Sequence, residues 1–189
     1  MSTAKKLASP EEYLRIDRAA ETKSQFYDGE IFAMAGASRK HNLIVANLIG
    51  ELRSLLKNSL CQVYPSDMRV MVEASGLYTY PDVVVVCDHP KFLDDQDDTL
   101  LNPILLIEVL SDSTADYDRG RKFEHYRRLG SLQEYILVAQ DKVHVERFRR
   151  QLQNEWNLWE TNDIEARLDL QSAAGSLPLA EIYAKVELS

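Results

Sequence analysis

The chain has 189 residues, of which 45% are hydrophobic and 28% are charged, and its formal net charge is −8. This length suits a single domain, residues 1–189, with a core that needs neither disulfides nor metal to hold it together. The acidic balance argues against nucleic-acid binding through general basicity, because counterion release requires clustered lysine and arginine. No segment approaches the roughly 18 apolar residues of a membrane span, so we expect no contact with a membrane.

The first residues and the two cysteines predict a cytoplasmic protein. Residues 1–14 contain no apolar run of the kind found in a secretory signal peptide. Cys61 and Cys87 lie among strand-like apolar residues and have no cysteine or histidine partner at zinc-finger spacing. We therefore expect two buried free thiols in a reducing cytosol.

The basic residues are unevenly distributed along this acidic chain. Such an enrichment is consistent with a nucleic-acid surface or with an ordinary solvated charged face. The enriched stretch contains Arg119, Arg121, Lys122, Arg127, Arg128, Arg147, Arg149 and Arg150.

The N-terminal third predicts helix, hairpin and helix. Ser9 is placed to cap a first helix, and Glu12 completes a capping box. Residues 23–36 (KSQFYDGEIFAMAG) alternate across Asp28–Gly29, which is a strong β-hairpin turn signal. Residues 38–57 then form a longer helix with one buried face, because their leucine and isoleucine residues recur at helical spacing.

The middle of the chain predicts strands. Residues 61–65 and 67–72 form two short strands, and the four valines within residues 80–88 are typical of a strand covered on both faces. The acidic segment 89–103 is expected to be an exposed loop, and residues 104–111 (ILLIEVLS) form another buried strand.

The last part of the chain alternates between helix and strand. Residues 116–129 predict a helix with Gly130 after its end, and residues 134–139 predict a strand that turns at 141–142 into residues 143–150. The tail adds short strands and a helix near 179–184. The whole pattern predicts an α/β (α+β) fold in which helices flank a central mixed sheet, with an N-terminal hairpin and a C-terminal hairpin extension.

Two acids stand inside the strand-like apolar segments. Asp82 occurs in YPDVVVV and Glu108 in LLIEVLS. A carboxylate among aliphatic residues is costly unless it is paired or bound to a cation. If the two strands are neighbours, the acids can converge on Mg²⁺, which typically takes one or two carboxylates. Lys122, on the next helix, is the candidate for stabilising the transition state. Taken singly, Asp82 is also consistent with a turn cap and Glu108 with an edge-strand acid.

Three segments, YPDVVVV, ILLIEVLSDST and DRGRKFEHYRRLGSLQEYILV, together resemble the Uma-two family of restriction endonucleases, in the PD-(D/E)XK nuclease superfamily. The early segment DGEIFAMAGAS, followed by His41, fits the same pattern, so the resemblance covers about residues 10–150. It implies a restriction-endonuclease-like core and a hydrolase that cleaves DNA with Mg²⁺, for which Mn²⁺ is the alternative ion. By analogy with superfamily nucleases it also implies a homodimer.

The resemblance assigns roles to individual residues. Asp82 matches the Asp of the PD element and Glu108 matches the (D/E), which makes both of them catalytic residues and metal ligands. The superfamily places a lysine two residues later, where this chain has Leu110, so the resemblance transfers that role to Lys122. Glu30 fits the early motif and is a further catalytic candidate.

Three other residues have open interpretations. His41, which also fits the early motif, is more consistent with a polar first-turn residue than with a base. Asp67 either faces the same cleft or caps a strand, and Tyr126 either lines the cleft or packs.

Two other classes of function stay open. The absence of lysine at position 110 and the acidic charge are also consistent with a nuclease fold that no longer cleaves and acts as a binding or interaction module. Alternatively, the acidic loop 89–103 docks on a partner. The chain has no phosphate-binding loop, dinucleotide fingerprint, nucleophile elbow or HExxH helix.

Overall fold

The computed structural model describes residues 8–111 and 114–188. Its main sheet is mixed, as the sequence predicts. The strands of this sheet are β3 (Gln62–Pro65), β6 (Val83–Val86), β8 (Leu105–Leu110), β9 (Glu134–Ala139), β10 (Val145–Arg150) and β11 (Trp156–Thr161). Their order is β11-β10-β9-β8-β6-β3. The pair β8–β9 runs parallel, whereas the other neighbouring pairs run antiparallel.

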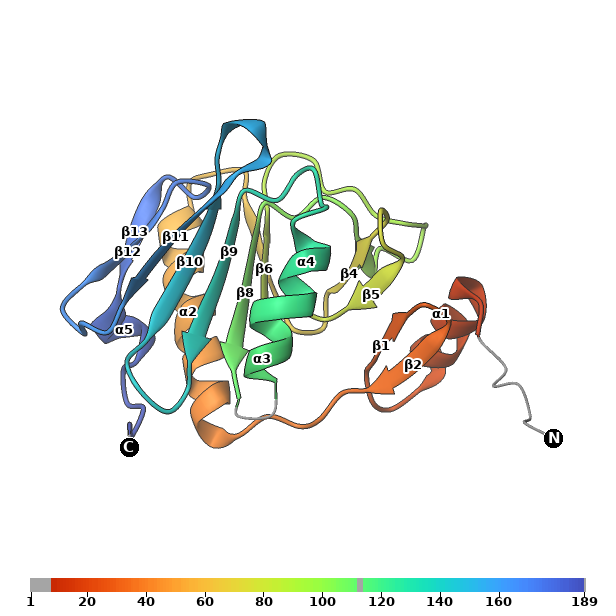
Figure 1. The fold of residues 1–189 in the computed structure, drawn as a ribbon, viewed down its shortest axis with the longest axis horizontal. Helices are drawn as coiled ribbons and strands as arrows, with labels where there is room; N and C mark the ends of the chain where they lie inside the picture. Colours follow the sequence, from red (N-terminus) through yellow and green to blue (C-terminus); the bar gives the residue numbers. More distant parts are fainter. Residues whose placement is uncertain (1–7, 112–113, 189) are drawn as a thin grey trace.

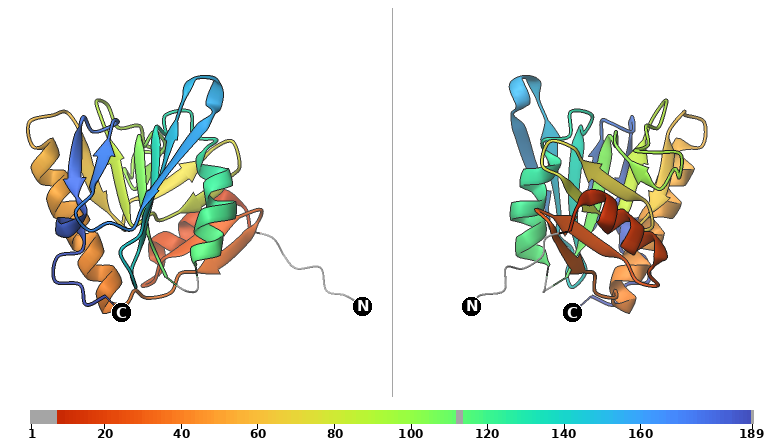
Figure 2. Two further views of the ribbon diagram at one scale, coloured as in Figure 1. Left: turned by 60° about the vertical axis from the view of Figure 1, so that its left-hand side comes forward. Right: turned by 90° about the vertical axis from the view of Figure 1, so that its right-hand side faces the viewer.

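Helices cover both faces of the main sheet (Figures 1 and 2). The long helix α2 (Arg39–Leu56) packs on one face, together with α5 (Leu179–Ile182) and the hairpin of β12 (Arg167–Leu170) and β13 (Gly175–Pro178). On the other face lies a three-part helical segment composed of α3 (Ala115–Tyr117), the π-helical turn η1 (Asp118–Lys122) and α4 (Phe123–Tyr126). All six residues of β8 are buried, because both of its faces are covered.

The alternating direction of side chains along β8 determines which helices Glu108 faces. Ile107 and Val109 belong to the core cluster under α2, whereas Leu106 and Leu110 belong to the cluster under the α3–α4 segment. Successive side chains of a strand point to opposite faces. Glu108 therefore lies on the α3–α4 side of the sheet.

A second sheet of five strands packs beside the first. It consists of β1 (Ser24–Tyr27), β2 (Glu30–Ala33), β4 (Arg69–Val72), β5 (Leu77–Thr79) and β7 (Thr99–Leu100), in the order β2-β1-β5-β4-β7. The predicted hairpin β1–β2 turns at Asp28 and Gly29, both at positive φ (50° and 79°). Helix α1 (Pro10–Ala19) has the predicted Ser9 cap and packs on this sheet, where Tyr13 stacks on Phe26 with ring centroids 5.0 Å apart.

Two predicted features differ in the structure, and one short element was not predicted. The acidic loop is not wholly exposed, because Thr99 and Leu100 are buried in β7 and pair with β4. The helix predicted for residues 116–129 is divided by the π-helical turn and ends at Tyr126. A short 3₁₀ turn, η2 (Leu152–Asn154), precedes β11.

The expectation of two free thiols is wrong, since Cys61 and Cys87 form a disulfide. The physical reason is strand register. The antiparallel pair β3–β6 aligns Gln62 with Val86. One step beyond this pair, Cys61 precedes Gln62 and Cys87 follows Val86, so the register places the two cysteines opposite each other. Within the described chain, no helix has the length and apolarity needed to cross a bilayer.

Candidate active site

Strand register brings the two acids together. Strands β6 and β8 are antiparallel, with Val83 opposite Ile107 and Val84 opposite Leu106. One further step in this register places Asp82, just before β6, opposite Glu108. Directly opposite residues of an antiparallel pair point to the same face. The two carboxylates are near enough that the charge of Asp82 acts on Glu108.

Two donors fix one oxygen of Asp82. The backbone N–H of Val109 donates to Asp82 Oδ2 over 2.7 Å, and His41 Nε2 lies 3.1 Å from the same atom. His41 is in the first turn of α2, where the side chain of the N-cap Ser38 accepts a hydrogen bond from the His41 backbone N–H. The side chains of His41 and Asp82 are 14% and 17% exposed, so solvent still reaches this end of the site.

Glu108 is deeply buried and contacts two side chains of the opposing helical segment, Lys122 and Tyr126. Lys122 Nζ lies 2.8 Å from Glu108 Oε1, and the hydroxyl of Tyr126 donates to the same oxygen over 2.8 Å. Lys122 Nζ also lies 3.3 Å from Asp118 Oδ1. Glu108, Lys122 and Asp118 are 3%, 6% and 3% exposed. The facing helical segment thus places a lysine ammonium next to Glu108, whereas position 110 on β8 itself is a leucine.

The π-helical turn η1 carries both Asp118 and Lys122. The backbone carbonyl of Asp118 accepts a hydrogen bond from the Tyr135 hydroxyl over 3.1 Å, which ties the turn to strand β9. π-Helical turns are rare and occur frequently at functional sites. The sequence did contain a signal for Asp118, since an acid four residues before a lysine on a helix forms an ion pair. Sequence reasoning nevertheless missed this residue.

The site contains more negative than positive charge. The carboxylates of Asp82, Glu108 and Asp118 surround one buried ammonium, that of Lys122. Burial raises the pKa of Glu108 to about 8; Lys122 opposes this shift, and Asp118 and Asp82 add to it. Burial lowers the pKa of Lys122, but the carboxylates of Glu108 and Asp118 outweigh burial and raise it overall. Lys122 therefore stays a cation, and Glu108 takes up a proton when no other cation is present.

These residues fit a divalent cation. The formal excess of two negative charges equals the charge of one such ion, and the donors are the hard carboxylate oxygens that Mg²⁺ and Mn²⁺ prefer. Asp118 Oδ1 is buried and accepts no hydrogen bond from the residues that the structure describes. Among the described residues, no group of three or more Asp, Glu, His or Cys side chains is arranged so that all of them could hold a metal ion. Such a cluster is not required, since Mg²⁺ usually keeps several waters and takes one or two carboxylates.

Three further residues that the sequence singled out have the following surroundings. Glu30 begins β2, half-buried and opposite Tyr27 in the hairpin, and its catalytic role stays a prediction. Asp67 is exposed and pairs with Lys23 over 3.0 Å. Leu110 packs in the apolar core beneath the α3–α4 segment.

Most of the enriched basic residues are engaged within the protein. Arg119 pairs with Glu146, Arg149 pairs with Glu134 and Asp169, and Arg150 donates to backbone carbonyls of residues 127, 129 and 132. These arginines attach strand β10 to η1, to strands β9 and β12, and to the turn after α4. The basic stretch is therefore mainly structural.

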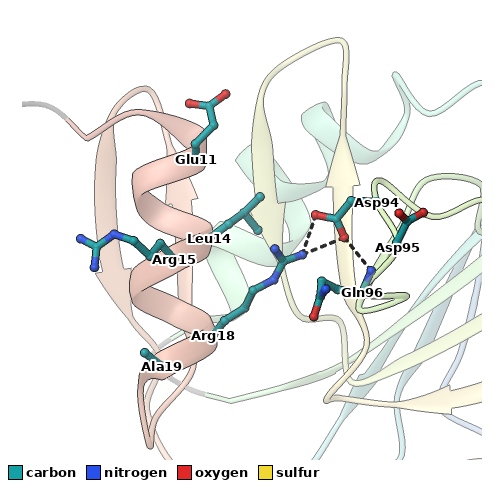
Figure 3. A pocket seen from close by; sticks show the side chains of 8 residues that line it. All are labelled: Glu11, Leu14, Arg15, Arg18, Ala19, Asp94, Asp95 and Gln96. Carbon is teal, nitrogen blue, oxygen red and sulfur yellow. Dashed lines mark hydrogen bonds and ion pairs between the residues drawn. The ribbon is translucent and has the colours of Figure 1, made fainter.

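A surface pocket of about 630 Å³ lies away from the acids, between α1 and the acidic loop (Figure 3). Arg18 reaches across it and binds Asp94 and Asp98, each over 2.8 Å. These two ion pairs anchor the loop against α1. The pocket has no carboxylate in common with the site at Asp82 and Glu108.

The comparison with known families agrees with this architecture. The Uma2 family model, described as "Putative restriction endonuclease", matches residues 10–180. The chain belongs to the Uma2 family. Two Synechocystis proteins are similar to this Uma2 member over most of its length. "Uncharacterized protein sll1609" is 37% identical over 87% of this chain and 93% of its own, and "Uncharacterized protein slr1290" is 35% identical over 93% and 90%.

A solved structure shares the fold of this Uma2 member. It is described as "a putative nuclease belonging to DUF820" from Anabaena variabilis and superposes with a TM-score of 0.76. The match covers 94% of this chain and 98% of that one at 19% identity. The likeness confirms the predicted fold class, namely mixed sheets flanked by helices in a nuclease-like arrangement.

Proposed function

We propose that this Uma2 member is a magnesium-dependent endonuclease that hydrolyses phosphodiester bonds of DNA. The observation that carries the proposal is the opposition of Asp82 and Glu108 on neighbouring strands, with the Lys122 ammonium 2.8 Å from Glu108. The family description and the order of the motifs support the reaction class. Mn²⁺ is a suitable substitute for Mg²⁺, because both accept carboxylate oxygens.

In the proposed reaction, Asp82 and Glu108 hold the ion. When bound, the ion lowers the pKa of a coordinated water and offsets charge that grows on the phosphate. Asp82 is presented in one orientation because Val109 and His41 both engage its Oδ2 atom. The buried setting strengthens each of these electrostatic contacts relative to water.

Lys122 acts in this reaction as a fixed positive charge. Its raised pKa keeps the ammonium protonated, which excludes a role as general base. A preorganised cation next to the scissile phosphate stabilises the negative charge of the pentavalent transition state. Tyr126 supports this arrangement because burial raises its pKa well above the usual range, so its hydroxyl keeps the proton that it donates to Glu108.

The proposed substrate is duplex DNA and the proposed assembly is a homodimer. One chain supplies one site, so cutting both strands of a duplex requires either two copies or two encounters. A symmetric dimer is the common solution among soluble homo-oligomers. Light scattering coupled to size-exclusion chromatography tests this assembly directly.

The test of the proposed function is nicking of supercoiled plasmid in Mg²⁺, in Mn²⁺ and in EDTA. Asp82→Asn and Glu108→Gln are expected to lose at least about a hundredfold in rate, since disturbing even the residues that support metal ligands costs 10–100-fold. The matched control is Glu124→Gln. Glu124 is an exposed acid on the same helical segment, paired with Arg128. Undiminished cleavage by Asp82→Asn would refute the proposed mechanism.

Metal binding without cleavage is the result that would favour a non-catalytic module. A protein with neither metal binding nor cleavage would favour a degenerate site. A thermal shift with Mn²⁺ alone separates these cases, because a ligand that binds only the folded state raises its stability.

A further inference from the structure

Asp118 has an unused oxygen facing the lysine of the site. Its Oδ1 atom is buried and accepts no hydrogen bond, although Lys122 Nζ lies 3.3 Å away. The same ammonium is closer to Glu108, at 2.8 Å. An ammonium has three donors. Lys122 is thus held mainly by Glu108, with a second carboxylate within reach whose oxygen is unsatisfied.

Glu108 has competing partners for the same oxygen. Its Oε1 atom accepts from the Tyr126 hydroxyl and pairs with Lys122. A divalent ion that binds this oxygen of Glu108 therefore has to displace its 2.8 Å contact with the Lys122 ammonium. A buried ammonium left without a carboxylate is expensive. The divalent ion can displace Lys122 from Glu108 at low cost only when another acceptor binds the Lys122 ammonium.

We propose that Asp118 is this second acceptor: it holds the Lys122 ammonium in the site when Glu108 releases it, so that Glu108 binds a divalent ion with Lys122 still beside it. Asp118 is then a positioning residue that acts through Lys122. Asp118 and Lys122 are four residues apart on the same turn, so Lys122 changes partner by a small rotation of its side chain. This inference rests on the proposed function, and it names a residue that the motif does not include.

Calorimetric titration with Mn²⁺ alone, without DNA, tests the proposal. Asp118→Asn leaves Lys122 held by Glu108, so Mn²⁺ binding is expected to weaken about tenfold, which corresponds to about 1.4 kcal/mol. In a Lys122→Met background the same substitution is expected to change Mn²⁺ binding less than about twofold, because no ammonium competes. Asp118→Glu is expected to recover most of the affinity. Glu124→Gln, the exposed acid of the neighbouring ion pair, is the control.

Two results would overturn the proposal. An equal loss in both backgrounds would mean that Asp118 binds the ion directly. An unchanged affinity after Asp118→Asn would mean that Asp118 has no influence on Glu108. Circular dichroism and urea unfolding of each variant ensure that only folded proteins are compared.

A second measurement needs no metal and separates the two proposals. In Glu108→Gln, Asp118 is the remaining carboxylate beside the Lys122 ammonium. Adding Asp118→Asn removes this second carboxylate as well. The double variant is expected to lose more stability than the two single variants together, which is the signature of coupled residues. Losses that simply add would overturn the inference even if the wild-type protein binds Mn²⁺. Absence of Mn²⁺ binding together with a loss that exceeds the sum would overturn the proposed function, while Asp118 would remain the second acceptor of the Lys122 ammonium.

Discussion

His41 and Asp82 come from distant parts of the chain and meet at one atom, with His41 Nε2 3.1 Å from Asp82 Oδ2. The backbone N–H of Val109 donates to the same oxygen. Since both described contacts use Oδ2, they orient the carboxylate so that Oδ1 is directed elsewhere. Under the proposed function, in which Asp82 is a metal ligand, His41 is a supporting residue that fixes this ligand rather than only the polar first-turn residue that the sequence favoured.

We therefore expect His41→Ala to weaken Mn²⁺ binding and to slow cleavage about 10–100-fold, the usual effect of removing a partner of a metal ligand. The fold should persist, because His41 lies at the start of α2 and the helix keeps its Ser38 cap. Calorimetry measures the affinity and plasmid nicking measures the rate. His89→Ala, at an exposed position in the acidic loop, provides the comparison. Equal behaviour of the two variants would remove His41 from the site.

Stability should depend on pH through Glu108. Burial raises the pKa of Glu108 in the folded chain to about 8, from an ordinary value of 4.5. Between these values the folded state holds a proton that the unfolded state has lost. The stabilisation is therefore complete below about pH 4.5 and is lost as the pH rises to about 8. At about 1.4 kcal/mol per pH unit, its upper limit is about 5 kcal/mol.

Urea unfolding in EDTA from pH 5 to pH 9 measures this effect. The difference between Glu108→Gln and Glu124→Gln isolates it, because both substitutions remove one carboxyl and only one of the two sites is buried. The Glu108→Gln variant should lose the slope and the Glu124→Gln variant should keep it. Parallel pH profiles for the two variants would contradict the raised pKa.

The same proton links metal binding to pH. A divalent ion must displace it from Glu108, so we expect the dissociation constant for Mn²⁺ to fall about tenfold for each pH unit up to about 8. Titration in two buffers with different ionisation enthalpies counts the protons released, and about one per ion is expected below pH 7. In Glu108→Gln, Mn²⁺ binding should release no proton from this position. A pH-independent affinity would show that the ion does not bind at Glu108.

Local signals made much of this fold predictable. The Asp28–Gly29 turn, the Ser38 cap of α2 and the apolar runs of β6 and β8 depend on neighbouring residues, and each of these elements forms as expected. The acid pair was predictable for a related reason. A carboxylate inside a buried strand is costly, so its presence there already indicates a partner.

The structural features that could not be predicted from the sequence depend on contacts between distant segments. The pairing of Cys61 with Cys87 follows from the register of β3 on β6, which no local pattern specifies. Strand β7 is only two residues long and exists because β4 is there to pair with it. The position of Asp118 beside Lys122 depends on the π-helical turn. The sequence periodicity predicts a regular helix there, so this position could not be predicted.

Two adjacent residues of α1 provide a test of how burial governs ion-pair energy. Asp17 pairs with Arg69 over 2.8 Å, and their side chains are 1% and 3% exposed. Asp17 also accepts hydrogen bonds from Ser24. Arg18 pairs with Asp94 over the same 2.8 Å, but these side chains are 28% and 39% exposed. The two ion pairs have the same distance, but they should contribute very differently to the free energy of unfolding.

We expect Asp17→Ala to lower the free energy of unfolding by about 3–5 kcal/mol, because the buried Arg69 guanidinium loses its buried acid and keeps only the more exposed Asp98, 3.2 Å away. Arg18→Ala should cost about 0–1 kcal/mol, since solvent screens an exposed pair. Urea unfolding measures both. The double variant Asp17→Ala/Arg69→Met should recover part of the loss, because no unpaired charge then remains buried at that place. Similar losses for Asp17→Ala and Arg18→Ala would mean that burial of the Asp17–Arg69 pair does not control its contribution to stability.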